Sequence, residues 1–400
     1  MDRATQFVCS RCGKPVPTPP RHDCAGSTTL ELRHDETVRE AFDASGDPDD
    51  IRRYEPFLPV DSLDGVSLGE GGTDLVAAPS LSSDLGVDLA LKLEGANPTG
   101  STKDRGSAVV VAHAAARGDD VVACASTGNA AASVAAYAAR SGLECCLFVP
   151  DHAPDAKAVQ PLVYGADVLA VEGTYDDAFD LCQRVTAASG WLDRSAGATP
   201  YTDAGARTLG YELAEQPGRV PDWVVVPMGN GGTIASAWQG LATFADLDIV
   251  ARTPRMLGVQ ADGTTPIFDA VHGTDGDGSE TCADSIDVGT PHRLTDAREA
   301  IEGSGGTAVA VSEEAIRSAT ARLGTEEGVF VEPACAAALA GVERAREDGT
   351  IDSGEDVVAV MTGTGLKDTD TARSVVDGST TVDSGTDPER IVTRYSSDSE

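Results

Sequence analysis

Lysine is rare in this chain, and one of its five lysines, Lys103, stands where an amine can do chemistry. It follows the turn-forming segment NPTGST (97–102), which comes after an apolar run at 89–93. The residues after Lys103 suit a helix, so the amine should lie near a positive helix end, where its neutral form costs less. A neutral lysine forms a Schiff base with an aldehyde. The alternative for an isolated lysine is an ordinary surface residue in a loop.

A glycine-rich turn follows the apolar run WVVVP (223–227) and opens another expected helix. Glycines there let backbone N–H groups converge on an anion, and the helix start adds partial positive charge, which favours a phosphate monoester. The turn does not have the glycine spacing of a dinucleotide fingerprint, and it lacks the G-K-[ST] of a Walker loop. A tight turn without a ligand is the alternative. The candidate phosphate ligands are Gly229, Asn230, Gly231, Gly232 and Thr233.

Two further polar segments follow apolar runs. Ser126, Thr127 and Asn129 come after VVACA (121–125), and Thr362 comes after VVAVM (357–361). Hydroxyl, amide and N–H groups at a helix start suit a carboxylate or a ring oxygen, and a hydroxyl at a strand end suits the edge of a bound ring. The alternatives are a helix N-cap and a glycine turn.

The elements that must position these residues alternate along the chain. Short β-branched runs predict strands, and the stretches between them have the apolar spacing of helices. This alternation predicts βαβ units and largely parallel sheets buried on both faces. Expected strands are 89–93, 121–125, 145–149, 167–171, 223–227, 256–260, 308–311 and 357–361, and expected helices are 130–141, 175–189, 233–245, 312–323 and 334–348. Residues 261–306 are expected to form loops.

Each chemical segment therefore falls at the carboxyl end of an expected strand, where open α/β sheets bind ligands. One lysine, one phosphate cradle and polar groups for a ring together describe a site for pyridoxal 5'-phosphate. On these motifs the chain resembles fold-type II pyridoxal-phosphate enzymes and, within that group, threonine synthases. The matching segments, in the family's order, are SLGEGGTDL (67–75), NPTGSTKDRG (97–106), ASTGNAAAS (125–133), YGADVLAVEGTYDDA (164–178), PDWVVVPMGNGGT (221–233), EPACAAALAG (332–341) and TGTGLKD (362–368).

The resemblance implies an α/β fold of two doubly wound domains with largely parallel sheets and the cofactor in the cleft between them. It places a large phosphate-binding domain at 51–97 plus 191–368 and an inserted small domain at 98–190. An N-terminal segment (1–50) and an acidic mobile tail (369–400) flank them. It also implies a homodimer acting on a small amino-acid substrate.

The resemblance also assigns roles to single residues. Lys103 would form the Schiff base with the cofactor, and Asn129 would bond the hydroxyl of the cofactor ring. The loop Gly229–Thr233 would hold the cofactor phosphate, and Thr362 would face the ring nitrogen. A neutral hydroxyl at that nitrogen would not enforce ring protonation. Ser126 and Thr127 are expected to meet the substrate.

The segment around residue 200 departs from the family pattern and bears on the substrate. The family has an arginine for the substrate phosphate in an Asn-Pro-x-Arg stretch, and Thr202 stands there in this chain. The other departures are Thr102 for a phenylalanine, Ala130 for a threonine and Thr364 for a histidine. Loss of a bidentate phosphate ligand weakens the case for a phosphorylated substrate unless another cation replaces it. The candidates are Arg105, Arg207 and Lys367.

Three functions follow in order. The first is a lyase of the threonine synthase type, which converts O-phosphohomoserine and water to L-threonine and phosphate. The second is β-elimination from serine or threonine, or β-replacement of the cysteine synthase type, which the missing arginine favours. The third is an inactive sensor of the same fold, which retention of Lys103 disfavours.

The N-terminal cysteines suggest a decayed metal site. Cys9 and Cys12 begin like the zinc ribbon that some archaeal threonine synthases carry, and Cys24 follows with His22 two residues before it. A Cys₃His zinc site is geometrically possible. Because the fourth cysteine is absent, a ribbon without metal is at least as plausible.

Charge narrows the partners. The chain has 30 basic and 65 acidic residues, a net charge of −35, and the acids are spread along its whole length. Binding to nucleic acid or to an anionic membrane needs a basic face, so neither is expected as a partner. Acid-rich, lysine-poor surfaces suit a salt-rich cytoplasm, where self-repulsion is screened. No apolar run reaches the roughly 18 residues of a membrane span, and no secretory leader is seen, so a cytoplasmic, halophilic protein is expected.

The charge makes a prediction about salt. Folding should weaken on dilution, because the Debye length grows from about 3 Å at 1 M salt to about 10 Å at 0.1 M and leaves the −35 charge unscreened. The measurement is the melting temperature across that range. A flat melting temperature would contradict the halophilic interpretation.

Overall fold

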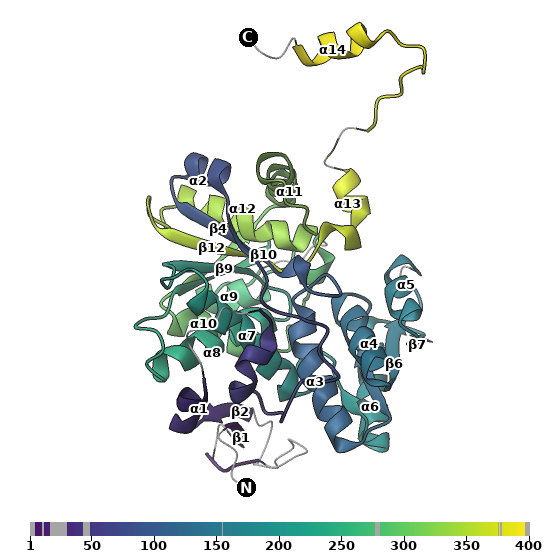
Figure 1. The fold of residues 1–400 in the computed structure, drawn as a ribbon, viewed down its shortest axis with the longest axis vertical. Coiled ribbons are helices and arrows are strands. Elements are labelled where there is room, and N and C mark those ends of the chain that lie inside the picture. The colour runs from purple at the N-terminus through teal and green to yellow at the C-terminus, as the bar shows by residue number, and fades with distance from the viewer. Residues whose placement is uncertain are drawn as a thin grey trace.

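Two separate sheets form the framework of the chain (Figure 1). The computed structural model describes residues 5–9, 12–16, 30–42, 49–153, 155–276, 281–374, 376 and 378–396. The larger sheet has the strand order β11-β10-β9-β12-β4-β3, and the smaller has β7-β6-β5-β8. All neighbours are parallel except the edge strand β3, which runs antiparallel to β4. The predicted α/β class with largely parallel sheets is confirmed.

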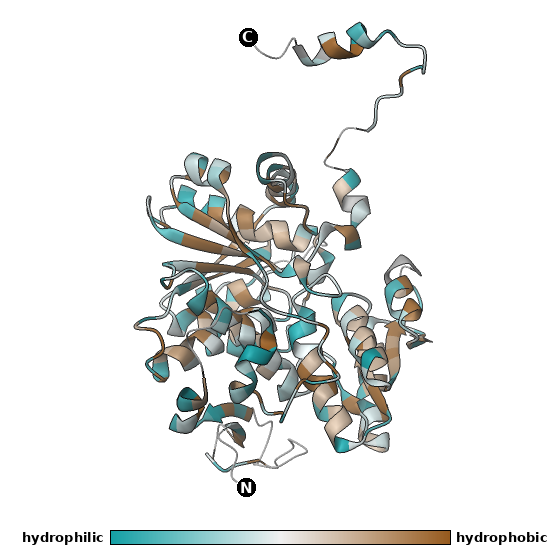
Figure 2. Ribbon diagram, viewed as in Figure 1, coloured by the Kyte–Doolittle hydropathy of each residue, from teal (hydrophilic) through white to brown (hydrophobic). Residues whose placement is uncertain are grey.

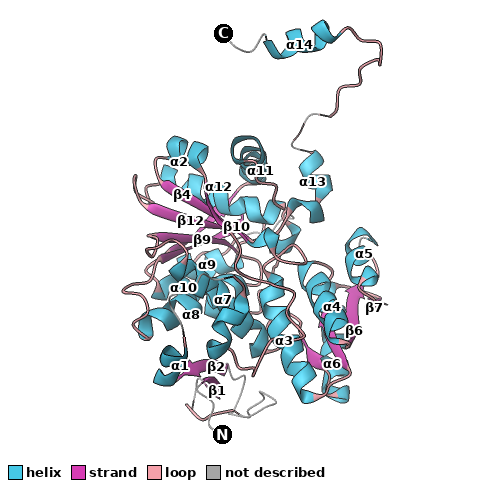
Figure 3. Ribbon diagram, viewed as in Figure 1, coloured by secondary structure: helices cyan, strands magenta, loops and turns pink. Residues whose placement is uncertain are grey.

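The strands of the larger sheet are β3 (Leu75–Ala77), β4 (Asp88–Leu93), β9 (Trp223–Pro227), β10 (Arg255–Ala261), β11 (Thr307–Val311) and β12 (Asp356–Met361). Those of the smaller sheet are β5 (Val121–Ala125), β6 (Glu144–Pro150), β7 (Asp167–Val171) and β8 (Leu192–Asp193). The helices, seen in Figure 3, are α1 (Glu36–Ala41), α2 (Pro79–Leu85), α3 (Lys103–Arg117), α4 (Asn129–Ser141), α5 (Asp155–Val163), α6 (Tyr175–Ser189), α7 (Pro200–Glu215), α8 (Gly232–Asp246), α9 (Pro266–His272), α10 (Leu294–Gly303), α11 (Glu313–Glu327), α12 (Pro333–Glu347), α13 (Thr369–Arg373) and α14 (Pro388–Ser396). Short 3₁₀ turns include η1 (Ile51–Phe57), η2 (Glu94–Ala96), η3 (Asp284–Ile286) and η4 (Gly365–Lys367).

Alternation explains why the central strands are apolar throughout. Successive side chains of a strand point to opposite faces. In β9, Trp223 and Val225 join a core built with α11 and α12, whereas Val224 and Val226 join another built with α7, α8 and α10. Both faces are buried, so the strand needs an unbroken apolar run rather than an alternating one. Figure 2 shows these strands as the most hydrophobic part of the larger sheet.

The smaller sheet is buried in the same way. Val122 and Cys124 of β5 pack in a cluster with α3 and α4, whereas Ala123 and Ala125 pack in a cluster with α6. We propose that residues 98–190 form an inserted small domain, and this separate sheet supports that proposal. The sheet extends to β8, slightly past the expected boundary at residue 190.

The flanking and loop regions hold more structure than expected. The prediction of loops over 261–306 is wrong at α9, η3 and α10, whose apolar side chains pack under the larger sheet. The N-terminal segment forms an antiparallel pair, β1 (Thr5–Cys9) with β2 (Leu30–His34), before α1. Beyond residue 368 lie the helices α13 and α14, and α14 stands apart from the body in Figure 1. Over the described ranges, no helix is both long and apolar enough to cross a membrane.

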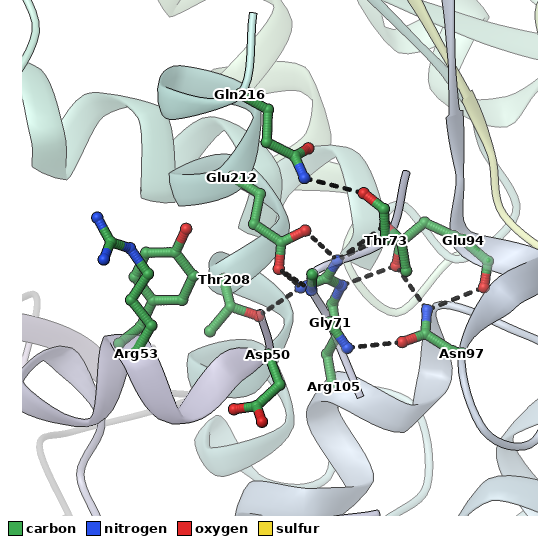
Figure 4. A network of polar contacts seen from close by, with 12 residues as sticks. Asp50, Arg53, Gly71, Thr73, Glu94, Asn97, Arg105, Thr208, Glu212 and Gln216 are labelled. Atoms are coloured by element: carbon green, nitrogen blue, oxygen red, sulfur yellow. Dashed lines mark hydrogen bonds and ion pairs between the residues drawn. The ribbon is translucent and has the colours of Figure 1, made fainter. Parts of the chain in front are cut away.

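A buried ion cluster ties three elements together (Figure 4). The Arg105 guanidinium in α3 donates to both oxygens of Glu94 in η2, each at 2.7 Å, and to both oxygens of Glu212 in α7, at 2.6 and 2.8 Å. Glu212 also accepts from Lys92 of β4 at 2.6 Å. All four side chains are fully buried. Burial opposes ionisation of Glu94, yet the Arg105 charge outweighs it and lowers the pKa of Glu94 to about 2.

Helix α7 packs at backbone contact with two other helices. A Cβ on Gly205 would lie 2.1 Å from the carbonyl oxygen of Arg105 in α3, and a Cβ on Gly210 would lie 2.1 Å from that of Ala237 in α8. Both distances are far below any real carbon–oxygen contact. Only glycine therefore permits this packing, and it fixes the N-terminal half of α3 relative to α8.

The ion cluster predicts a large stability effect for one conservative change. Glu212→Gln should lower the free energy of unfolding by about 3–5 kcal/mol, because it leaves two buried cations, Lys92 and Arg105, short of their shared anion. Chemical unfolding in high salt measures it. The matched control is Glu302→Gln, whose pair with Arg298 is half exposed and contributes about 1 kcal/mol or less. Equal effects of the two variants would show that the cluster does not hold the fold.

Candidate active site

The predicted chemical segments meet at the carboxyl ends of four parallel strands. Lys103 begins α3 after β4, Asn129 begins α4 after β5, Thr233 lies in the first turn of α8 after β9, and Thr362 follows β12. The Thr102 N–H donates to the Thr362 carbonyl at 2.9 Å. Residues on either side also pair, since Ser101 and Gly363 form an antiparallel bridge. The lysine segment and the end of β12 are thereby joined through their backbones.

Lys103 also reaches the glycine-rich turn. Its Nζ lies 3.5 Å from Thr233 Oγ1, although the two residues are 130 positions apart in sequence. Gly231 caps α8 with a φ of +82°, which turns the chain into the helix and suits glycine. The first N–H groups of α8 have no partner within the helix, so they point toward the space that Lys103 approaches.

The remaining loop residues are held by a second strand-to-helix connection. Asn230 accepts from the Arg293 N–H at 3.0 Å through its carbonyl, and its Oδ1 accepts from the His292 N–H at 3.2 Å. A Cβ on Gly229 would lie 2.8 Å from the Ser285 carbonyl. A Cβ on Gly231 would meet Ala297 and the Arg293 carbonyl, both at 2.8 Å. These two glycines are therefore required by packing, whereas a Cβ on Gly232 would meet nothing nearer than Arg293 Cγ at 4.0 Å.

The surroundings of Lys103 favour a neutral amine. Burial and then the positive charge of Arg194 lower the pKa of Lys103 to about 8, while Glu332 acts in the opposite direction. Arg194 lies beside the start of α3, since its Nη2 donates to the Lys103 carbonyl at 3.2 Å and its Nε to Ser107 at 2.9 Å. A lower pKa provides more nucleophilic amine at neutral pH than an ordinary lysine has.

Thr362 is paired with a thiol. Its Oγ1 lies 3.1 Å from Cys335 Sγ, and the Gly363 N–H donates to the same sulfur at 3.0 Å. Burial and the nearby Glu332 carboxylate raise the pKa of Cys335 well above its usual range, so the sulfur stays a neutral thiol. The thiol fixes the hydroxyl of Thr362 in place beside the strand end.

Asn129 is held by a buried carboxylate. Its Nδ2 donates to the two oxygens of Glu332 at 3.0 and 3.2 Å. Glu332 is the residue just before α12, and burial raises its pKa although Asn129 and two lysines favour its ionised form. Ser126 and Thr127 precede Asn129 and are half-buried, and Ser126 Oγ accepts from the Gly128 N–H at 3.2 Å.

Sequence reasoning missed three residues of this site. Glu332 and Cys335 lie in the family-like segment EPACAAALAG, but nothing in their types or spacing indicates contact with Asn129 or Thr362. Arg194 lies in the short connection after β8 and carries no motif at all. Only the folded chain brings these side chains to the strand ends.

Two of the three candidate cations for a substrate phosphate are wrong. Arg105 is occupied by Glu94 and Glu212 in the buried cluster. Arg207 donates to Gln239 at 3.1 Å and to the Leu32 carbonyl at 3.1 Å, and it lines a separate surface hollow of about 860 Å³ beside the N-terminal strands. Thr202 packs against Gly106 of α3.

Lys367 is the remaining candidate. Its Nζ is buried, and no residue that the structure describes gives it a hydrogen-bond partner.

The N-terminal cysteine motif is only partly described. Cys9 ends β1, and the Cys12 N–H lies 3.4 Å from Cys9 Sγ. Cys24 and His22 lie outside the described residues. Within the described ranges, no three His, Cys, Asp or Glu side chains are grouped to hold a metal ion. The zinc site stays a prediction.

The donor set suits pyridoxal phosphate. A buried amine of lowered pKa stands 3.5 Å from a hydroxyl in the first turn of a helix, where N–H groups and partial positive charge favour a phosphate. An amide from α4 and a hydroxyl from the end of β12 supply the polar groups for a ring. These are the groups the cofactor needs: an amine for its aldehyde, donors for its phosphate and polar contacts for its ring.

Comparison with known proteins agrees with this geometry. Residues 66–363 match the family model described as pyridoxal-phosphate dependent enzyme. The threonine synthase of Methanocaldococcus jannaschii is 42% identical over 331 residues, which cover 80% of this chain and 82% of that protein. The threonine synthase of Mycobacterium bovis is 41% identical over 81% of this chain and 90% of its own length.

The likeness extends to solved structures. The processed form of threonine deaminase isoform 2 from Solanum lycopersicum superposes with a TM-score of 0.67 and 24% identity, covering 78% of this chain and 89% of that chain. At this identity the likeness concerns the fold. Together with the sequence matches, it places the chain in the family of pyridoxal-phosphate dependent enzymes, among relatives that are threonine synthases.

Proposed function

We propose that this enzyme converts O-phosphohomoserine and water to L-threonine and phosphate. The observation that carries the proposal is the approach of Lys103 Nζ to Thr233 Oγ1 at 3.5 Å, which joins an amine of lowered pKa to a phosphate-binding helix start. The identity of about 40% to threonine synthases, over four fifths of the chain, supports this substrate. In the reaction, the bond from the γ-carbon to the phosphate oxygen breaks and a bond from the β-carbon to the water oxygen forms.

Pyridoxal phosphate, when bound, supplies an aldehyde that bonds amino groups and a ring that delocalises electrons. The chain's own residues do the rest. The start of α8, with Thr233, holds the phosphate end, and Asn129 and Thr362 hold opposite parts of the ring. Lys103 is the amine that anchors the aldehyde and, once released, removes the substrate α-proton through its neutral Nζ.

The decisive experiment is a substrate panel in high salt. The purified enzyme with its cofactor is given O-phosphohomoserine, threonine, serine and O-acetylserine. Release of phosphate together with L-threonine from the first is the expected result. Turnover of only the unphosphorylated amino acids would contradict the proposal.

The second candidate is β-elimination or β-replacement on an unphosphorylated amino acid. Its supporting observation is Thr202, which packs against α3 where the family carries a phosphate-binding arginine. Pyruvate or 2-oxobutyrate from serine or threonine would support it, as would cysteine from O-acetylserine and sulfide.

The salt-rich cytoplasm and the homodimer belong to the proposal as well. The net charge of −35 supports the former, and the resemblance to dimeric relatives supports the latter. Light scattering in molar salt should give twice the 41.1 kDa mass of the chain. A monomer mass would contradict the dimer.

The low pKa of Lys103 predicts a pH profile for its reactivity in the cofactor-free protein. An amine reacts in its neutral form, so labelling of Lys103 by an amine reagent should rise with pH and level off above about 8. Mass spectrometry of the labelled peptide follows it. Arg194→Gln should move the midpoint upward, because it removes a positive charge that disfavours the ammonium form. A midpoint near the ordinary lysine value of about 10.4 would contradict the geometry.

The helix start predicts a loss of cofactor affinity for a nearly isosteric change. Thr233→Val should weaken binding of pyridoxal phosphate roughly tenfold to a hundredfold, because a hydrogen bond to a charged group contributes about 1.5–3 kcal/mol. Equilibrium titration of the cofactor-free protein measures it. Thr243→Val on the same helix is the control, since its hydroxyl bonds only the Gln239 carbonyl. Unchanged affinity in the Thr233 variant would remove the loop from the phosphate site.

A further inference from the structure

Lys367 is a buried cation without a counter-ion beside the lysine segment. It ends η4, the turn after β12, whose Thr364 N–H donates to the Gly100 carbonyl at 3.0 Å. The side chain of Lys367 runs over Gly100, since a Cβ there would lie 3.0 Å from Lys367 Cε. Gly100 stands three residues before Lys103, so the Lys367 ammonium lies against the same loop as the reactive amine.

The nearby carboxylates do not pair with Lys367. Asp104 accepts from the Thr99 N–H and from the Thr99 hydroxyl at 2.6 and 2.5 Å. Glu332 is engaged with Asn129. Both acids act on Lys367 only from a distance, and burial lowers the pKa of Lys367 despite them. Across the described residues, neither forms a hydrogen bond or an ion pair with its ammonium group.

An unpaired ammonium away from water is costly, whereas one paired with an anion is not. The other cations near the site already have partners. Arg105 is held by Glu94 and Glu212, and Arg194 is bonded to Ser107 and the Lys103 carbonyl. Lys367 is therefore the cation beside this loop whose charge the folded chain leaves uncompensated, and an incoming anion is what would compensate it.

We propose that Lys367 binds the phosphate of the substrate, in place of the arginine that Thr202 replaces. This assignment rests on the proposed function. A lysine provides a single mobile point charge instead of a planar fork, so it would hold a phosphate less rigidly than a bidentate arginine. It reaches the substrate from the β12 side, whereas position 202 belongs to α7.

The test compares ligands that differ only in the phosphate. Enzyme with its cofactor is titrated with O-phosphohomoserine and with homoserine, and spectral changes of the cofactor report binding. Lys367→Met should weaken binding of O-phosphohomoserine tenfold to a hundredfold and leave homoserine unchanged. Lys367→Arg should retain most of the affinity, because it keeps the charge. Lys14→Met, a change at an exposed lysine, is the matched control and should change neither ligand.

Kinetics and stability separate binding from a structural role. Lys367→Met should raise KM for O-phosphohomoserine more than it lowers kcat. Inorganic phosphate should raise the melting temperature of the wild-type enzyme with its cofactor but not that of the variant. Without phosphate, Lys367→Met should be at least as stable as the wild type, because it removes an unpaired buried charge. If it fails to fold, Lys367→Gln replaces it in every measurement.

The outcomes distinguish this inference from the proposed function. Wild-type turnover of O-phosphohomoserine with unchanged affinity in the Lys367 variants would overturn the lysine's role and leave the function standing. Equal losses for both ligands would also overturn it, because they would indicate a structural effect. If the wild type binds O-phosphohomoserine through Lys367 but releases no threonine, the proposed reaction fails and the phosphate site stands.

Discussion

The geometry of this enzyme depends on the buried ion cluster of Arg105 with Glu94 and Glu212. Arg105 lies two residues after Lys103, so whatever fixes its guanidinium also fixes the start of α3. Its two partners come from η2 and α7, segments more than 100 residues apart. A charge in the protein interior is tolerated only when all of its partners are in place. The cluster therefore forms as a whole or not at all, and the reactive amine is positioned when it forms.

The electrostatics around Lys103 result from a balance of opposed charges. Burial, Arg194 and the helix starts disfavour its ammonium form, while Glu332 favours it. The same Glu332 holds Asn129 and lies next to Cys335, which in turn holds Thr362. One carboxylate thus connects three of the predicted site residues. This arrangement places polar groups on several sides of one amine without pairing it directly.

Much of this framework follows from the sequence, and the limits are physical. β5, β7 and β9 begin and end at the predicted residues, because a strand buried on both faces must be an apolar run with polar ends. The helices between 261 and 306 escaped prediction, since α9 and α10 are short and lie among glycines and polar residues. Arg105 was expected to bind a substrate and instead binds Glu212. A sequence displays a charge but not the partner that folding brings to it.

The packing of α7 has a consequence for how this sequence can vary over evolutionary time. Gly205 and Gly210 lie against the backbones of α3 and α8, and Gly240 of α8 lies against the Arg207 carbonyl, where a Cβ would stand 2.3 Å away. Even alanine is too large for these contacts, so no single substitution there is neutral. Surface residues can drift toward acidity and adapt the protein to another medium, while the three helices keep one spacing. Divergence in this lineage is thus confined to the exterior, and the interval between amine and phosphate loop is inherited unchanged.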